Sequence, residues 1–323
     1  MRVLVTGGTG KVGNAIARAL AARGDEVRAL VRDAAAPVPD GVEQVRGDVT
    51  DPQSLQAAAE GCELVFNAMG IPEQWLADED EFDRVNARGT EAVVRAAAAA
   101  GARRVVHTST IDVFHAESGG RLDETHVADY PKGTAYERSK QRAERLALSA
   151  AGDRIELVMV NPAAVYGLGP IASPSFERDM FEPLVRGRRF AVPALPAGGC
   201  GVVFSEGVAR GHLLAADRGR PGERYILCDR HVTLRGLAEA VVVAAGRGFV
   251  PPVLPSGLAS AMAALGEPVA RLVGKPPLLP RGQLHFFRWN AAPDSSRAQD
   301  ELGWEPTSLE NGLRETLTSM GLA

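Results

Sequence analysis

The segment TGGTGKVG, residues 6–13, constrains the fold of this chain more than any other stretch. It directly follows the apolar run RVLVT (2–6), which predicts a strand, and it leads into an alanine-rich stretch that predicts a helix. Glycine lets the backbone turn tightly and approach a pyrophosphate, whose charge is stabilised at the helix N-terminus. The spacing of Gly7, Gly10 and Gly13 therefore predicts a dinucleotide-binding loop, with a ligand-free glycine turn as the alternative.

The first half of the chain alternates short β-branched runs with longer stretches rich in alanine, leucine and arginine. The predicted strands are 2–6, 26–31, 42–46, 63–67, 104–109 and 155–161. The predicted helices are 11–23, 52–60, 81–100 and 134–151. Because helices separate strands that are continuously apolar, we expect a parallel sheet covered on both faces. The predicted fold class is α/β, a Rossmann-type doubly wound parallel sheet.

The pattern changes after Pro162, where glycine and proline become frequent and residues 168–200 are loop-like. Further helices are expected at 232–246 and 294–306, and 257–273 is an amphipathic stretch between two proline-rich segments. We therefore expect a smaller, mostly C-terminal substrate-binding lobe beside the dinucleotide-binding Rossmann domain. The lobe comprises about 162–200 and 247–289, and the Rossmann domain comprises 1–161 with returning segments at about 201–246 and 290–323.

Charge and composition argue against several classes of partner. The chain has a formal net charge of -4 and no basic tract, so neither nucleic acid nor an anionic membrane surface is an expected partner. No window approaches the ~18 consecutive apolar residues of a transmembrane helix, and the first apolar run is too short for a signal peptide. Cys62, Cys200 and Cys228 are far apart, which indicates free thiols in a reducing cytoplasm and no metal site.

The end of the second predicted strand bears on the choice of cofactor. Dinucleotide sites often carry an acidic residue there, which binds the ribose hydroxyls. Here Val31 and Arg32 occupy the tip, and Asp33 follows one residue later. Arg32 can pair with a 2′-phosphate, and Lys11 adds a cation inside the glycine loop, so we expect NADP(H). NAD(H) is the alternative if Asp33 turns inward or if Arg32 is an ordinary solvated arginine.

The segment AYERSK, residues 135–140, places Tyr136 and Lys140 four residues apart. On a helix these two side chains share a face. A phenol has a pKa of about 10, and a nearby ammonium favours the phenolate and brings the group toward its working range. We therefore expect Tyr136 to act as an acid–base group whose pKa is lowered by Lys140. The alternative is a surface pair on a polar helix.

A third polar group is expected at the end of the predicted strand 104–109. The segment VVHTST ends in Ser109 and Thr110, and ligands of open α/β sheets bind at the carboxyl ends of strands. We predict that one of these hydroxyls polarises a substrate oxygen. The alternative, that they cap the loop, fits one of them equally well.

Together these motifs resemble the extended short-chain dehydrogenase/reductase superfamily, the NAD-dependent epimerase/dehydratase group. The matching segments are TGGTGKVG, GDVTD (47–51), 85–110, DET (123–125), YERSK, NPAAVYGLG (161–169) and ELGWEP (301–306). The resemblance implies a catalytic triad of Thr110, Tyr136 and Lys140, with Ser109 beside it. It implies cofactor contacts from Gly7, Gly10, Lys11, Val12, Gly13, Arg32, Asp48, Val49, Ala68, Tyr136, Lys140, Pro162 and Val165. It also implies a homodimer that pairs helices 81–100 and 134–151.

Two departures from the family pattern narrow the expected reaction. Nucleotide-sugar members usually carry asparagine where this chain has Ala164, and often an arginine for the diphosphate where it has Cys200. Without these contacts a pyrophosphate is poorly held. The segments VRALVRD and NPAAVYGLGP are more similar to the dihydroflavonol-reductase and 3β-hydroxysteroid-dehydrogenase branches. This similarity implies hydride transfer between nicotinamide and a ketone, aldehyde or secondary alcohol of a fairly apolar small molecule.

Apolar side chains of the lobe are candidates for the lining of a substrate pocket. They are Phe176, Phe181, Phe190, Leu258, Met262, Leu265, Phe286, Phe287 and Trp289. The alternative is that they form only the core of the lobe. Two other functions stay open, a nucleotide-sugar epimerase or dehydratase with tightly bound NAD and a dinucleotide-binding sensor without turnover. The Thr–Tyr–Lys set weighs against the sensor, which has no need of it.

Overall fold

The computed structural model describes residues 1–323 except 74, 172–173, 274–276 and 278, some of which fall in the predicted lobe. Its largest element is a seven-stranded sheet of strand order β11-β7-β5-β4-β1-β2-β3, in which every neighbouring pair is parallel. The strands are β1 Arg2–Thr6, β2 Glu26–Val31, β3 Val42–Arg46, β4 Leu64–Asn67, β5 Arg104–Thr108, β7 Glu156–Pro162 and β11 Arg224–Leu227. The predicted parallel sheet is confirmed, and β11 adds a strand that the sequence pattern did not predict.

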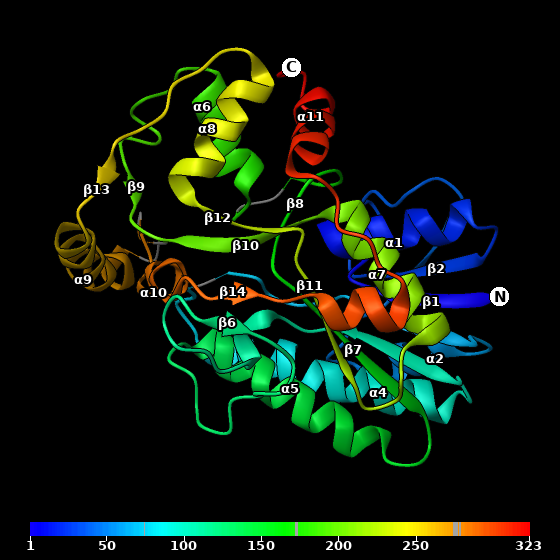
Figure 1. Ribbon diagram of the computed structural model, residues 1–323. Helices are drawn as coiled ribbons and strands as arrows, with labels where there is room; N and C mark the ends of the chain where they lie inside the picture. Colours follow the sequence, from blue (N-terminus) through cyan, green and yellow to red (C-terminus); the bar gives the residue numbers. More distant parts are fainter. Residues whose placement is uncertain (74, 172–173, 274–276, 278) are drawn as a thin grey trace.

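Helices cover both faces of this sheet (Figure 1). One face carries α2 Pro52–Ala59, α4 Thr90–Ala99 and α5 Ala135–Ala151, and the other carries α1 Lys11–Ala22, α7 Ser205–Arg218 and η4 Ala298–Leu302. Val3 and Val5 of β1 belong to one apolar cluster with Ile16 of α1, whereas Leu4 belongs to another with Val94 of α4. Because successive strand side chains point to opposite faces, both faces of the sheet are buried.

The predicted helix 81–100 is present as three consecutive segments, α3 Asp80–Phe82, the π-helical turn η1 Asp83–Gly89, and α4. Gly89 ends the wide turn in close contact with the chain below it. A Cβ there would lie 2.9 Å from Met69 Cε and 3.0 Å from Val49 Cγ2. The missing side chain therefore lets this helix approach the ends of the parallel strands.

A smaller sheet and its helices lie beyond the carboxyl end of β7. The three strands are β8 Ala164–Tyr166, β10 Gly199–Phe204 and β12 Arg230–Thr233, in the order β12-β10-β8. The helices are η3 Glu177–Phe181, α6 Glu182–Val185, α8 Leu234–Ala245 and α11 Leu309–Ser319. A second apolar core joins them, and it contains Phe181, Leu237 and Leu313. Residues 168–200, predicted to be loop-like, thus include the two short helices η3 and α6.

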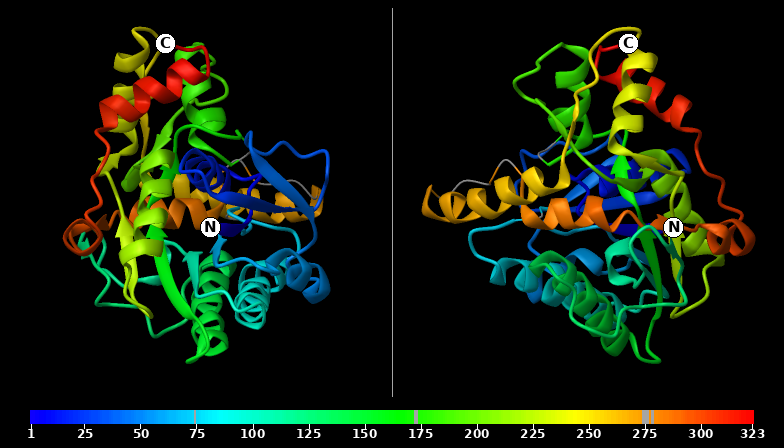
Figure 2. Two further views of the ribbon diagram at one scale, coloured as in Figure 1. Left: turned by 90° about the vertical axis from the view of Figure 1, so that its right-hand side faces the viewer. Right: turned by 60° about the vertical axis from the view of Figure 1, so that its left-hand side comes forward.

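Two helices lie at the periphery of the molecule and pack on each other, α9 Ser256–Val273 and α10 Arg281–Trp289 (Figure 2). Two short parallel pairs complete the structure, β13 Val253–Leu254 with β9 Leu195–Pro196 and β14 Ala292–Pro293 with β6 Arg121–Leu122. The amphipathic stretch 257–273 of the sequence is part of helix α9. Among the described residues, no helix is both long enough and apolar enough to cross a membrane.

Candidate active site

The glycine loop connects β1 to α1 and lies at the carboxyl end of the central sheet. Gly7 has φ +73°, and a Cβ on it would lie 2.6 Å from the carbonyl oxygen of Ala68. A Cβ on Gly13 would lie 2.2 Å from the Gly7 oxygen, so both glycines are required by packing. A Cβ on Gly10 would meet only the Gly7 oxygen, at 3.4 Å. Packing alone therefore does not require a glycine at position 10. The open side of Gly10 lies at the N-terminus of α1, where a pyrophosphate can approach the backbone.

The tip of β2 has the character that the sequence predicted for an adenosine ribose site. Val31 is buried, Arg32 is exposed, and the Asp33 carboxylate accepts a hydrogen bond from the Ala35 N–H at 2.9 Å. Burial raises the pKa of Asp48, but hydrogen bonds from Thr50 and the charge of Arg32 outweigh it, so the pKa is lowered overall. Arg32 and Asp48 therefore lie close enough to interact across this edge of the sheet.

Lys11, the second predicted cation, points toward the smaller sheet. Its ammonium lies 3.1 Å from Glu177 Oε1 of η3 and donates to the Gly167 carbonyl at 3.0 Å. Glu177 is fully buried and also accepts from the Gly167 N–H at 2.6 Å. The charge of Lys11 is therefore already paired, which leaves Arg32 as the cation on which the NADP prediction depends.

The first turn of α5 positions Tyr136. Thr134 and Glu137 form a reciprocal capping box, because the Thr134 hydroxyl accepts from the Glu137 N–H at 3.1 Å while Glu137 Oε2 accepts from the Thr134 N–H at 2.8 Å. Lys140 follows one turn later, is 5% exposed, and donates to the Thr108 carbonyl at 2.9 Å. Tyr136 and Lys140 thus face the carboxyl end of β5, where Thr110 follows.

The ionisation of these groups is set mainly by burial. Burial lowers the pKa of Lys140 to about 8, although the Glu144 and Asp112 carboxylates oppose the change. Burial and the nearby Asp112 carboxylate raise the pKa of Tyr136, while a hydrogen bond with Thr110 opposes this. The expected lowering of the Tyr136 pKa by Lys140 is therefore not found. The physical reasons are the burial of the phenol and the charge of Asp112, while the Lys140 ammonium is bound at the Thr108 carbonyl.

The two candidate hydroxyls at the end of β5 have different surroundings. Thr110 interacts with the Tyr136 phenol. Ser109 is 5% exposed, and its Oγ has no hydrogen-bond partner among the residues that the structure describes. Its backbone N–H donates to the Val160 carbonyl at 2.7 Å. The structure thus brings Thr110 to Tyr136 and leaves Ser109 inside the sheet edge.

One polar residue of this site was missed by the sequence reasoning. Asp112 is 6% exposed and lies in a short 3-10 turn, residues Ile111–Val113, directly after Thr110. Its Oδ2 accepts from the Thr110 hydroxyl at 3.0 Å, and its N–H donates back to the same hydroxyl at 3.2 Å. Burial and the charge of Glu137 raise the pKa of this carboxyl to about 7. The sequence signal that could have identified Asp112 is an acidic residue between the apolar residues Ile111 and Val113.

The remaining predicted cofactor residues are divided between the central sheet with its helices and the smaller sheet. Val12 follows Lys11 in α1, and Ala68 follows β4 against Gly7. Pro162 ends β7 opposite Leu227 of β11, and Val165 pairs with Val203 in the smaller sheet.

A cavity of about 180 Å³ opens beside Tyr136. Its apolar lining includes Trp75, Leu76 and Phe82, and the Phe82 ring meets the Tyr136 ring edge-on at 6.1 Å between centroids. Charged side chains at the cavity are paired, Arg281 with Glu267 at 3.3 Å and Arg138 with Glu79 at 3.9 Å. The lining of the cavity is therefore mixed, with apolar side chains near Tyr136 and charged side chains that are paired with one another.

The apolar pocket lining that the sequence predicted is not assembled in the structure. Phe181 and Phe287 are buried in the core of the smaller sheet. Phe190, Leu258 and Leu265 are exposed on the surface. For Phe181 and Phe287 the structure therefore agrees with the alternative that the sequence left open, the core of the lobe. Apolar side chains beside Tyr136 come from another segment, which includes Trp75 and Leu76.

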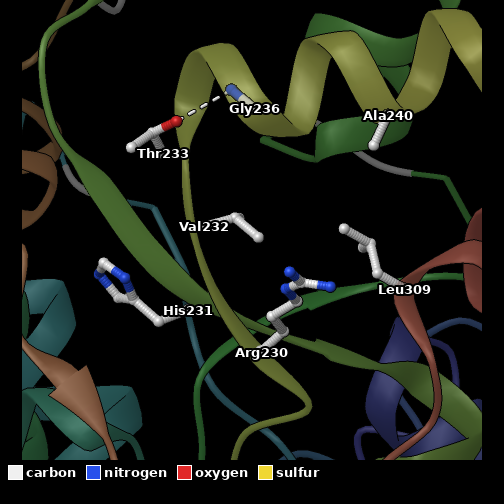
Figure 3. A pocket seen from close by; sticks show the side chains of 7 residues that line it. All are labelled: Arg230, His231, Val232, Thr233, Gly236, Ala240 and Leu309. Carbon is white, nitrogen blue, oxygen red and sulfur yellow. Dashed lines mark hydrogen bonds between the residues drawn. The ribbon is translucent and has the colours of Figure 1, made fainter.

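A larger cavity, of about 360 Å³, lies in the smaller sheet. Figure 3 shows β12 and the start of α8 around it, with the Thr233 hydroxyl accepting from the Gly236 N–H at 3.0 Å. It is lined by Arg230, His231, Val232, Thr233, Gly236, Ala240 and Leu309. None of the predicted site residues lines this cavity, whereas Tyr136 lines the smaller one.

Comparison with known proteins shows the family to which the chain is similar. The model of the NAD dependent epimerase/dehydratase family matches residues 3–228. Sterol demethylase protein B of Methylococcus capsulatus is 33% identical, over 98% of this chain and 97% of that protein. A putative dihydroflavonol 4-reductase of Synechocystis is 31% identical, over 97% and 92%. A solved UDP-glucose 4-epimerase of Thermus thermophilus, in complex with NAD, has a TM-score of 0.75 at 24% identity and full coverage of both chains.

Proposed function

This chain belongs to the NAD dependent epimerase/dehydratase family, and we propose that it transfers hydride between NADP(H) and a ketone or aldehyde of a fairly apolar small molecule. It is an NAD(P)-dependent oxidoreductase of the extended short-chain dehydrogenase/reductase type. The observation that carries the proposal is the convergence of Thr110, Tyr136 and Lys140 at the carboxyl end of β5.

Each residue of this set has a chemical task in carbonyl reduction. Bound NADPH supplies the hydride to the carbonyl carbon. Tyr136 donates its proton to the carbonyl oxygen, and the raised pKa of Tyr136 keeps that proton in place at neutral pH. Thr110 donates a hydrogen bond to the same oxygen, where negative charge grows. Lys140, a three-donor ammonium that gives one hydrogen bond to Thr108, has donors left for the ribose hydroxyls of the cofactor.

The proposed cofactor preference rests on the tip of β2. Buried Val31 offers the ribose no carboxylate, and the Asp33 carboxylate is occupied by the Ala35 N–H. Exposed Arg32 is free to form a charge-assisted hydrogen bond with a 2′-phosphate. These contacts favour NADP(H) over NAD(H).

The proposed substrate class rests on the residue at position 200, which carries no charge for a diphosphate, and on the lining of the cavity beside Tyr136. Cys200, at the position of a diphosphate-binding arginine, is buried in β10, and burial raises the pKa of its thiol to about 12. A neutral thiol gives a nucleotide-sugar diphosphate no counter-charge. The lining of the cavity beside Tyr136 includes the apolar side chains of Trp75, Leu76 and Phe82, and its charged side chains are paired with one another. An apolar ketone therefore fits better, as the names of the sterol and dihydroflavonol relatives suggest.

The proposal is tested by turnover of defined carbonyl compounds. Purified protein is mixed with NADPH or NADH and with an alkyl methyl ketone, an aryl ketone, a 3-oxo ester or a 3-ketosteroid. We expect NADPH consumption that depends on the ketone, with one alcohol formed per cofactor oxidised. Tightly bound NAD in the absorbance spectrum, with conversion of UDP-glucose and no ketone reduction, would instead establish a nucleotide-sugar enzyme.

A further inference from the structure

The hydroxyl of Thr110 has one proton, and two acceptors compete for it, the Asp112 carboxylate and the substrate oxygen. In the structure that proton is directed to Asp112 Oδ2, 3.0 Å away, while the hydroxyl oxygen accepts from the Asp112 N–H at 3.2 Å. Carbonyl reduction needs the same proton to point at the substrate oxygen between Thr110 and Tyr136. A hydroxyl donates once and accepts up to twice, so Thr110 serves the substrate only when Asp112 no longer takes its proton.

We propose that Asp112 is a positioning residue that sets the direction of the Thr110 hydrogen bond. As a neutral acid, Asp112 donates its own proton to the Thr110 oxygen and leaves the Thr110 proton free for the substrate. As a carboxylate, it takes the Thr110 proton and removes one of the two donors from the carbonyl oxygen. This inference rests on the proposed reductase function and adds a residue outside the Thr–Tyr–Lys set.

The surroundings of Asp112 make both ionisation states accessible. Its side chain is almost fully buried, and Oδ1 has no hydrogen-bond partner among the described residues. Four ionisable side chains of two elements face it, Tyr136, Glu137 and Lys140 of α5 and Lys132 of the preceding loop. The Lys132 ammonium forms its hydrogen bond with another group, because it donates to the Phe114 carbonyl at 2.9 Å. Burial and Glu137 together outweigh the Thr110 hydrogen bond and the two lysines, so Asp112 changes its ionisation state at about neutral pH.

The direction of the pH effect follows from these states. Below the pKa of about 7, Asp112 is neutral and Thr110 donates to the substrate. Above it, the neutral fraction falls about tenfold per pH unit, and kcat for reduction should fall with it. The fall should level off at about 10²–10³-fold, the usual worth of one such donor. Tyr136 stays protonated over this range because its own pKa is raised, so it does not cause the fall.

The test is the pH profile of kcat for ketone reduction between about pH 6 and 9, at saturating NADPH with the best ketone of the panel. In Asp112→Asn the side chain cannot ionise, so the alkaline fall should vanish. In Thr110→Val, kcat should be lower by about 10²-fold at pH 6 and no longer fall as the pH rises. Asp229→Asn is the matched control, because Asp229 has a carboxyl with a pKa raised by burial to about 6 that binds the Phe204 and Thr307 N–H groups. It should keep the wild-type profile.

Lys140 has a pKa of about 8 and is the competing source of an alkaline fall. Its titration in the free enzyme is followed separately, in kcat/KM for NADPH. A wild-type profile without the fall, or a fall that persists in Thr110→Val, would overturn the role of Asp112 and leave the reductase proposal intact. If Asp112→Asn does not fold, Thr110→Val decides alone. Absence of ketone reduction by the wild-type protein would overturn both proposals.

Discussion

At the residue scale, burial decides which groups of the active site carry charge. Lys140 loses proton affinity although two carboxylates oppose the loss, and Asp112 gains proton affinity although two lysines oppose the gain. Tyr136 keeps its proton although Thr110 favours the phenolate. The site therefore holds a protonated phenol at neutral pH, which is the form that reduction consumes.

The cofactor preference depends on one exposed residue. Arg32→Ala should raise KM for NADPH about tenfold, a loss of about 1.4 kcal/mol in binding, and leave KM for NADH nearly unchanged. Steady-state kinetics with each cofactor measure this, with Arg314→Ala on the distant helix α11 as a control. Unchanged affinity for NADPH, or NADH as the better donor in the wild-type protein, would contradict the assignment.

At the element scale, packing and ligand binding depend on different glycines of the glycine loop, Gly13 for packing and Gly10 for the ligand. Gly10→Val should fold with near wild-type stability, since its Cβ has room, but it should lose NADPH binding. Gly13→Val should destabilise the protein by about 3 kcal/mol or more, because its Cβ would lie 2.2 Å from the Gly7 oxygen. Urea unfolding and NADPH titration measure the two effects. Normal NADPH affinity in Gly10→Val would show that the loop does not hold the pyrophosphate.

The elements that the sequence predicted well are those whose local pattern is unambiguous. β1, β2 and β3 have the predicted bounds, because apolar β-branched runs between turns admit one interpretation. The helices in 168–200 were missed, since frequent glycine and proline hide short helical turns that tertiary packing stabilises. The ion pair of Lys11 with Glu177 joins residues far apart in the sequence, and no local pattern predicts it. Asp112 was missed because burial, which gives it its role, is a tertiary property.

At the scale of the whole molecule, Lys11 and Glu177 connect the central sheet to the smaller one. Lys11→Met should lower the free energy of unfolding by about 3 kcal/mol, because it leaves the carboxylate of fully buried Glu177 without its counter-charge. The control is Arg235→Met, which breaks the exposed pair with Glu239 on α8 and should cost less than about 1 kcal/mol. Equal costs in urea unfolding would show that the buried pair does not stabilise the contact between the two sheets.

The central claim, that Tyr136 supplies the proton in carbonyl reduction, is tested most directly by Tyr136→Phe. The substitution removes only the phenol oxygen and keeps the ring that packs against Phe82. We predict that kcat for ketone reduction falls by about 10²–10⁴-fold, the usual worth of a positioned acid–base group. KM for NADPH should change little, because Lys140 still binds the ribose. Near wild-type kcat in Tyr136→Phe, with the chemical step rate-limiting, would contradict the account.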